Sequence, residues 1–356
     1  MKALLIEPLE PLVLSKKPVA SQEFITGSHA VLPIPSPTTI SGLVGSALNV
    51  TLESQANADH ISLLRKLIEG LEEKGGCGKP VIKGPLLWFK DLSNEPYVCL
   101  GSIYAPLREI RVEQGSRNIK VYLSKADHGK YVKPVVEERI GVKLVKGYGN
   151  RTEKVVDKGY TYKYSTLSYR VVGSGDSVIP TFIYLYNCDK ELEPGAYRVG
   201  GEGRIASVNV TKLEALPEEI AKTLELIESP LTLQNKGLHL TLTPTPLIPL
   251  ALKELNTLTL DESKPNVIGL EFVERVEGSI QADPEELEPG GKLKRKIERL
   301  NLGYSEVLSS RRPQILALPT GTIIRTKKPE RYAETIETLW SLGFASLLRL
   351  NGFRTP

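Results

Sequence analysis

The segment Gly200–Arg204 (GGEGR) concentrates residues that suit close contact with an anion. Glycines let the backbone approach a ligand closely, and successive N–H groups in such a turn can cradle a phosphate. The segment is neither a P-loop nor a dinucleotide-binding fingerprint, because no Lys-Ser/Thr pair follows and the glycine spacing differs. A plain glycine turn between two domains is the alternative. The candidate ligand contacts are Gly200, Gly201, Gly203 and Arg204, whose guanidinium would add a bidentate contact.

The stretch from Arg139 to Arg170 interleaves basic and aromatic residues and predicts a long β-hairpin. It holds eight Lys or Arg, two acids and five tyrosines. Positive charge follows a nucleic-acid backbone while aromatic rings stack on bases, so this composition is typical of single-strand binding. The alternative is a half-buried strand whose tyrosines cover the core. The candidate RNA contacts are Arg139, Lys143, Lys146, Arg151, Lys154, Lys158, Tyr160, Tyr162, Lys163, Tyr164 and Arg170.

The segment PIPSPTTISG, residues 33–42, places hydroxyls where a helix should begin. Apolar residues recur at helical spacing after Pro37, which predicts a helix over residues 37–48 with Ser36 as its N-cap. Free amides and hydroxyls at a helix N-terminus suit a phosphate, whereas simple capping needs only Ser36. The candidate anion contacts here are Ser36, Thr38, Thr39 and Ser41.

No pattern of catalytic or metal-ligating residues is present in the sequence. It lacks HExxH, a DxD pair and a GxSxG elbow, so we expect no enzyme, no metal and no cofactor. Three distant cysteines without a CxxC, Cys77, Cys99 and Cys188, exclude a zinc finger and predict separate thiols instead of a disulfide framework. A metal-independent ribonuclease that uses His29 as a general base stays open as the alternative.

Length and charge agree with a two-domain protein that binds a polyanion. The chain has 356 residues, of which 40% are hydrophobic and 25% charged, with a net charge of +4. Between Arg108 and Arg170 fifteen basic residues face seven acids, so a basic middle sits on an acidic remainder. The single methionine is a compositional hint of a thermophile. No apolar run approaches a membrane span, and Glu7 and Pro8 interrupt the first apolar stretch, so we expect a cytoplasmic protein without a signal peptide or membrane contact.

The order of the expected elements predicts an α+β fold. Helices are expected at residues 37–48, 59–74, 216–228 and 331–344, and short strands separated by turn residues dominate 79–200. Because strands and helices do not alternate regularly, a doubly wound sheet is excluded. We expect one domain over residues 1–204, with the hairpin near 139–170 as an insertion, and a second over 205–356.

Several segments in this order resemble the RAMP proteins of CRISPR systems, and among them the subunit-three family of the type III-B effector, the Cmr complex. They are PIPSPTTISGLVGSAL, EERIGVKL with GYTYKY after the hairpin tip, VGGEGR, ALPTGTII and LGFASLLRLNGF. The last is poorer in glycine than the family's usual loop, and the hairpin tip matches no fixed pattern.

The resemblance implies two ferredoxin-like (RRM-like) domains with a projecting β-hairpin thumb, and a non-catalytic protein. It implies binding to the 5′ handle of the crRNA and to target RNA, with the thumb inserted at the guide–target duplex. The implied protein partners are the large polymerase-like Cas subunit and the backbone RAMP subunits. The family alternatives are a RAMP-type endoribonuclease that processes precursor crRNA and an assembly protein without RNA contacts.

Overall fold

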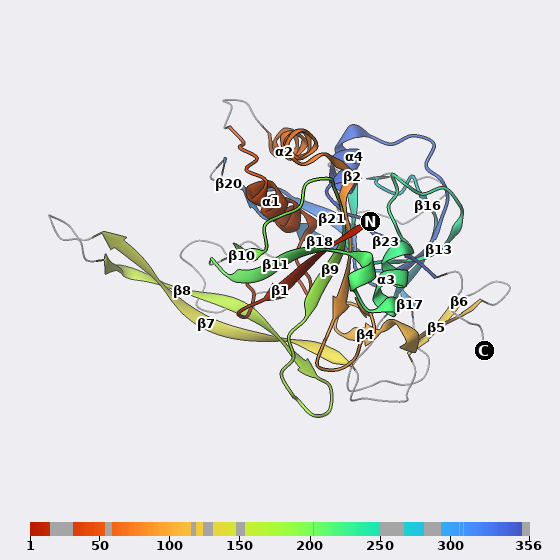
Figure 1. Cartoon of the computed structure of the whole chain (residues 1–356), viewed down its shortest axis with the longest axis horizontal. Coiled ribbons are helices and arrows are strands. Elements are labelled where there is room, and N and C mark those ends of the chain that lie inside the picture. Colours follow the sequence, from red (N-terminus) through yellow and green to blue (C-terminus); the bar gives the residue numbers. More distant parts are fainter. Residues whose placement is uncertain are drawn as a thin grey trace.

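The computed structural model shows a strand-rich α+β protein from which one long hairpin projects (Figure 1). The structure describes residues 1–14, 31–53, 59–114, 119–123, 131–146, 154–201, 203–249, 267–280, 293–305, 307–308 and 310–350. His29, the general base of the ribonuclease alternative, lies outside these residues.

The helices within this part of the chain are α1 (Pro37–Ala47), α2 (His60–Gly75), α3 (Glu218–Glu225) and α4 (Glu334–Ser341). The carboxylate of Asp59 accepts a hydrogen bond from the Ser62 amide at 2.8 Å and so caps α2, which ends where Gly76 adopts a φ of 60°. No described helix combines the length and the apolar composition needed to cross a bilayer.

The first half of the chain forms a nine-stranded sheet in the order β10-β11-β1-β9-β2-β3-β4-β7-β8. Its strands are β1 (Lys2–Pro8), β2 (Cys77–Trp88), β3 (Tyr97–Cys99), β4 (Tyr104–Pro106), β7 (Val132–Lys146), β8 (Lys154–Val171), β9 (Thr181–Cys188), β10 (Gly195–Arg198) and β11 (Ile205–Lys212). A separate ribbon pairs β5 (Ile110–Gln114) with β6 (Ile119–Leu123). Because β11 pairs with β1, this sheet continues to Lys212, past the expected domain boundary at residue 204.

The second half forms a six-stranded sheet, order β12-β23-β13-β22-β16-β17, and a four-stranded sheet, order β15-β14-β21-β18. The strands of the first are β12 (Ile227–Glu228), β13 (Gly237–Thr241), β16 (Val273–Ile280), β17 (Leu293–Lys294), β22 (Thr322–Thr326) and β23 (Leu347–Arg349). Those of the second are β14 (Thr245–Pro249), β15 (Val267–Ile268), β18 (Glu298–Asn301) and β21 (Gln314–Leu318), while β19 (Tyr304–Ser305) pairs with β20 (Ser310–Arg311). Strands β21 and β22, which lie on either side of Gly321, belong to different sheets.

The two large sheets share one strand order. In the first, β11-β1-β9-β2 are neighbours, and in the second, β23-β13-β22-β16 are neighbours. Numbered along the chain within each half, both orders are fourth, first, third, second, and every neighbouring pair is antiparallel.

Strand β1 lies in the interior of the first sheet and contributes to two cores. Leu4 and Ile6 pack in a cluster with α1 and α2, whereas Ala3 packs in a second cluster that includes Leu240 and Ile323 of the second sheet. Successive side chains of this strand therefore face opposite sides of the sheet. Because the second cluster contains residues of both halves, the halves share a hydrophobic core.

Close backbone contacts also join the halves. A Cβ added at Gly321, where φ is 77°, would lie 2.9 Å from the Cα of Leu100 in the first half. Thr38 and Ser41 of α1 donate hydrogen bonds to the carbonyls of Leu302 and Leu342, each at 3.0 Å. The close approach of the Leu100 backbone leaves no room for a larger residue at Gly321.

A polar cluster centred on Glu228 lies at the same junction. Its carboxylate is 2.6 Å from Nε2 of the fully buried His239 and 3.1 Å from the guanidinium of Arg349. Lys83 of β2 donates to the Ile227 carbonyl at 2.9 Å, and burial lowers the pKa of its ammonium group, opposed by the charge of Glu228. The cluster therefore links β2 of the first sheet to β12, β13 and β23 of the second.

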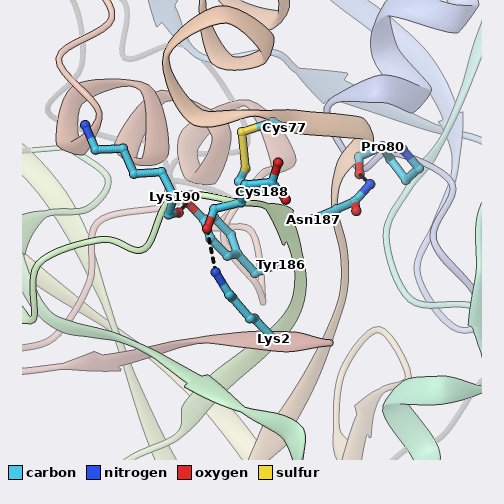
Figure 2. Close-up of a disulfide and its surroundings, with 8 residues drawn as sticks. Lys2, Cys77, Pro80, Tyr186, Asn187, Cys188 and Lys190 are labelled. Atoms are coloured by element: carbon cyan, nitrogen blue, oxygen red, sulfur yellow. Dashed lines mark hydrogen bonds between the residues drawn. A yellow bond between two sulfur atoms is a disulfide. The ribbon is translucent and has the colours of Figure 1, made fainter.

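Cys77 and Cys188 form a disulfide, so the expectation of three separate thiols is wrong. The bond joins the start of β2 to the end of β9, and Figure 2 shows it beside the hydrogen bond from Asn187 to the carbonyl of Pro80. The two cysteines are distant in sequence but lie opposite each other in the β2–β9 register. Cys spacing along the chain carries no information about such a pairing. Only Cys99 is a free thiol, and it is buried.

Candidate nucleic-acid interface

The predicted basic and aromatic segment lies in a two-stranded ribbon that leaves the body of the protein (Figure 1). Strands β7 and β8 pair from Val132 opposite Val171 to Lys146 opposite Lys154, with one irregularity between Val142 and Leu144. Side chains alternate between the two faces of a strand, so the ribbon has two surfaces.

The base of the ribbon is part of the hydrophobic core. Tyr169 of β8 is buried, and its ring centroid lies 5.6 Å from that of Tyr104, 6.3 Å from Phe182 and 6.4 Å from Phe89. Burial raises the pKa of the Tyr169 hydroxyl well above its usual value. For this tyrosine the core alternative applies, and it is not available to a base.

Two exposed arginines, Arg139 and Arg170, lie where the ribbon leaves the core of the protein. Arg139 and Arg170 share the carboxylate of Glu137, at 3.5 and 3.8 Å, and their side chains remain 41% and 45% exposed. Ser168 also donates to Glu137, at 3.2 Å. One carboxylate between two guanidinium groups leaves a net positive surface on this face, which suits a phosphate backbone.

The outer part of the ribbon carries most of the other predicted contacts, and the structure gives their backbone positions. Those in the paired strands are Lys143, Lys146, Lys154, Lys158, Tyr160, Tyr162 and Lys163. Arg151 lies outside the described residues, as does the rest of the tip from residue 147 to 153.

The opposite face of the ribbon carries exposed apolar side chains where it leaves the core. Val136 and Ile140 of β7 are 48% and 72% exposed, and the exposed Glu138 lies between them on the same face. This face therefore mixes apolar and acidic groups, whereas the other carries Arg139 and Arg170.

The hydroxyls at the start of α1 are used inside the protein. Ser36, Thr38 and Ser41 are buried, and Thr39 is partly exposed. Ser36 occupies the N-cap position with Pro37 following it, as predicted, but its Oγ lies 2.9 Å from Oγ1 of Thr38 and does not cap the helix amides. Thr38 and Ser41 donate their hydrogen bonds to carbonyls of the second half, as described above, so these two hydroxyls connect the halves.

The glycine-rich turn packs against residues 9–14, which follow β1 and which we call the strap. The amide of Gly201 donates to the Val13 carbonyl at 2.9 Å. At Gly200, where φ is 81°, a Cβ would lie 2.6 Å from the same oxygen, and Gly203 also has a positive φ, 67°. Packing and backbone conformation thus account for the glycines without a ligand.

Arg204 pairs with the carboxylate of Glu10 in the strap and donates through its second terminal nitrogen to the Tyr164 hydroxyl at 2.9 Å. Its guanidinium carbon lies 5.6 Å from the centre of the Tyr164 ring. The Arg204 side chain is only 12% exposed. Sequence reasoning named both Arg204 and Tyr164 as candidate contacts, in separate segments, but missed Glu10, since an acid within an apolar segment carries no local signal of its partner.

No group of three or more His, Cys, Asp or Glu side chains that could hold a metal occurs in the part of the chain that the structure describes.

No protein-family model matches the sequence, and no curated protein is significantly similar to it. Solved structures that contain a chain with the same fold include two of the Cmr-beta complex. One is the type III-B Cmr-beta complex bound to cognate target RNA and AMPPnP in state 1, with a TM-score of 0.55, 16% identity, and coverage of 97% of this chain and 95% of that chain. The other is Cmr-beta bound to cognate target RNA, with a TM-score of 0.54, 16% identity, and coverage of 98% and 96%.

The chain has the fold of a Cmr-beta subunit. The match covers both halves of this chain and nearly all of the chains it is compared with, so the fold is shared as a whole and not through one domain.

Proposed function

We propose that the protein is a non-catalytic RNA-binding subunit of a type III-B CRISPR (Cmr) effector complex, in which it holds the 5′ handle of the crRNA. The single observation that carries this proposal is the full-length fold match to Cmr-beta chains. In this role the protein contacts the large polymerase-like subunit and the first backbone subunit, and its β7–β8 ribbon is the thumb directed towards the guide–target duplex.

The domain architecture that we propose is a pair of ferredoxin-like units. Its support is the shared antiparallel strand order of the two large sheets, which is that of a split β-α-β fold. Helices α1 and α2 follow the first strand of the first unit, and α4 precedes the last strand of the second.

The chemistry of the ribbon supports RNA as its ligand. Arg139 and Arg170 are exposed on a positive surface, and further lysines follow along both strands and tyrosines along β8. Single-stranded RNA, such as a guide handle, exposes phosphates and base faces to such a surface.

The test is to isolate the protein from its assembled complex and sequence the RNA that co-purifies with it. The proposal expects short RNAs with a constant 5′ end, and crosslinks from this chain to that end. RNAs without a common 5′ end, or crosslinks confined to other subunits, would overturn it. Metal-independent cleavage of repeat RNA by the protein, lost in the His29→Ala variant, would instead support the endoribonuclease alternative.

A second measurement locates the RNA contact on the ribbon. Replacing both Lys154 and Lys158 with alanine should lower the slope of log K against log salt by about 0.7 for each lost phosphate contact. Lys294→Ala with Lys296→Ala is the matched control, because both lysines are exposed and lie on the second half. Equal slopes for the two double variants would contradict binding through the ribbon.

A further inference from the structure

Arg204 connects three segments that are far apart in the sequence. The arginine follows β10, Glu10 lies in the strap after β1, and Tyr164 lies on β8. The strap is itself held to the sheet, because Glu10 also accepts a hydrogen bond from the Ile205 amide at 3.1 Å. Through this arginine the ribbon is attached to a fixed part of the body.

The contact lies where the ribbon passes from the core to solvent. On β8, Ser165 and Leu167 are buried, and the Leu167 amide donates to the strap carbonyl of Leu12 at 2.8 Å. One step further out, Tyr164 is opposite Arg139, which is exposed. Any bending of the ribbon relative to the body must therefore occur at or beyond the Arg204 contact.

A two-stranded ribbon is only marginally stable alone, so contacts at its base determine its direction. The guanidinium group can bond two acceptors at once in a fixed planar arrangement, whereas an ammonium group is a single point charge. The low exposure of Arg204 also limits competition from water and salt.

We propose that Arg204 is a positioning residue that sets the direction of the β7–β8 ribbon through Glu10 and Tyr164, and that it does not bind RNA itself. The consequence for RNA rests on the proposed function above. If loss of the contact reduces the fraction of molecules with a correctly directed ribbon to about a tenth, the apparent Kd rises about tenfold.

The test measures the direction of the ribbon without RNA. Spin labels at Ile140→Cys on β7 and Glu69→Cys on α2, both exposed positions, report the distance between the ribbon and the body. The buried Cys99 does not compete for label, because burial raises the pKa of its thiol to about 11. Pulsed electron–electron double resonance then gives the distribution of distances between the two labels for each variant.

The variants separate positioning from simple loss of charge. Arg204→Ala and Arg204→Lys should both broaden the distribution, and Tyr164→Phe, which removes only the hydroxyl acceptor, should broaden it without lowering the Tm. Arg198→Ala is the matched control, since Arg198 is exposed on the neighbouring strand β10. RNA affinity measured on the same proteins should fall with the broadening and stay constant in the control.

A narrow, unshifted distribution in Arg204→Ala and Tyr164→Phe would overturn the proposal, and lower RNA affinity alongside it would identify Arg204 as a direct RNA contact. If the distance distribution broadens in the variants but the unsubstituted protein binds no RNA, the positioning role is supported and the proposed function is overturned instead.

Discussion

Reduction of the Cys77–Cys188 disulfide should strongly destabilise this protein. The two cysteines are 111 residues apart, and the loop between them contains β2 to β9, including the whole β7–β8 ribbon. A crosslink removes conformational entropy from the unfolded chain in proportion to the logarithm of the loop length. For a loop of this size the chain-entropy relation gives about 5 kcal/mol, which is comparable with the total stability of many domains.

The measurement compares denaturant unfolding of the oxidised and the reduced protein, which have the same sequence and therefore differ only in the bond. Thiol titration in denaturant should find one thiol before reduction, that of Cys99, and three after it. Cys99→Ala is the matched control, because it removes a buried sulfur that is not crosslinked and should keep the full effect of the reductant. Three thiols before reduction, or identical unfolding midpoints in the two states, would refute the reasoning.

Three further substitutions test other parts of the fold and site. Tyr169→Ala should cost about 3–5 kcal/mol, measured by denaturant unfolding, because it removes a buried ring from the base of the ribbon. Ser41→Ala should cost about 1–3 kcal/mol by leaving the Leu342 carbonyl without its donor, with RNA affinity unchanged; lower affinity at constant stability would instead indicate a ligand site. Burial raises the pKa of the Glu228 carboxyl, but the hydrogen bond with His239 and nearby positive charges outweigh burial and hold this pKa below its usual value. Its contribution to stability is therefore present above the usual carboxyl pKa and is lost as the pH falls through the lowered one. Glu228→Gln should remove this part of the acid dependence, and unchanged acid unfolding would contradict it.

Local patterns were sufficient to predict the elements themselves. Apolar spacing predicted α2 within one residue at each end, because the start and end of a helix depend on neighbouring residues. The two arms of the ribbon were also predictable, since a hairpin pairs segments that are adjacent in the chain. The helix expected over 216–228 is shorter, because residues 227 and 228 join the second sheet as β12.

Pairings between distant segments could not be predicted in this way. Glu10 and Arg204 are separated by 194 residues, and Cys77 and Cys188 by 111. Each partner looks ordinary in its own surroundings, so only the strand order brings the pairs together. For the same reason, β11 was expected in the second domain although it completes the first sheet beside β1.

The same distinction separates the candidate interface from the features that only resembled one. Hydroxyls at a helix N-terminus and glycines in a turn are suited to an anion, but Thr38, Ser41 and Gly201 already donate to backbone carbonyls of other segments. A group whose hydrogen bond is made inside the fold must break that bond before it can bind a ligand, which opposes binding. Arg139 and Arg170 differ, because they keep much of their surface exposed and share a single carboxylate. Contacts within the fold therefore do not neutralise all of the positive charge where the ribbon leaves the core. For this reason the ribbon is a stronger candidate for RNA binding than the helix N-terminus or the glycine turn.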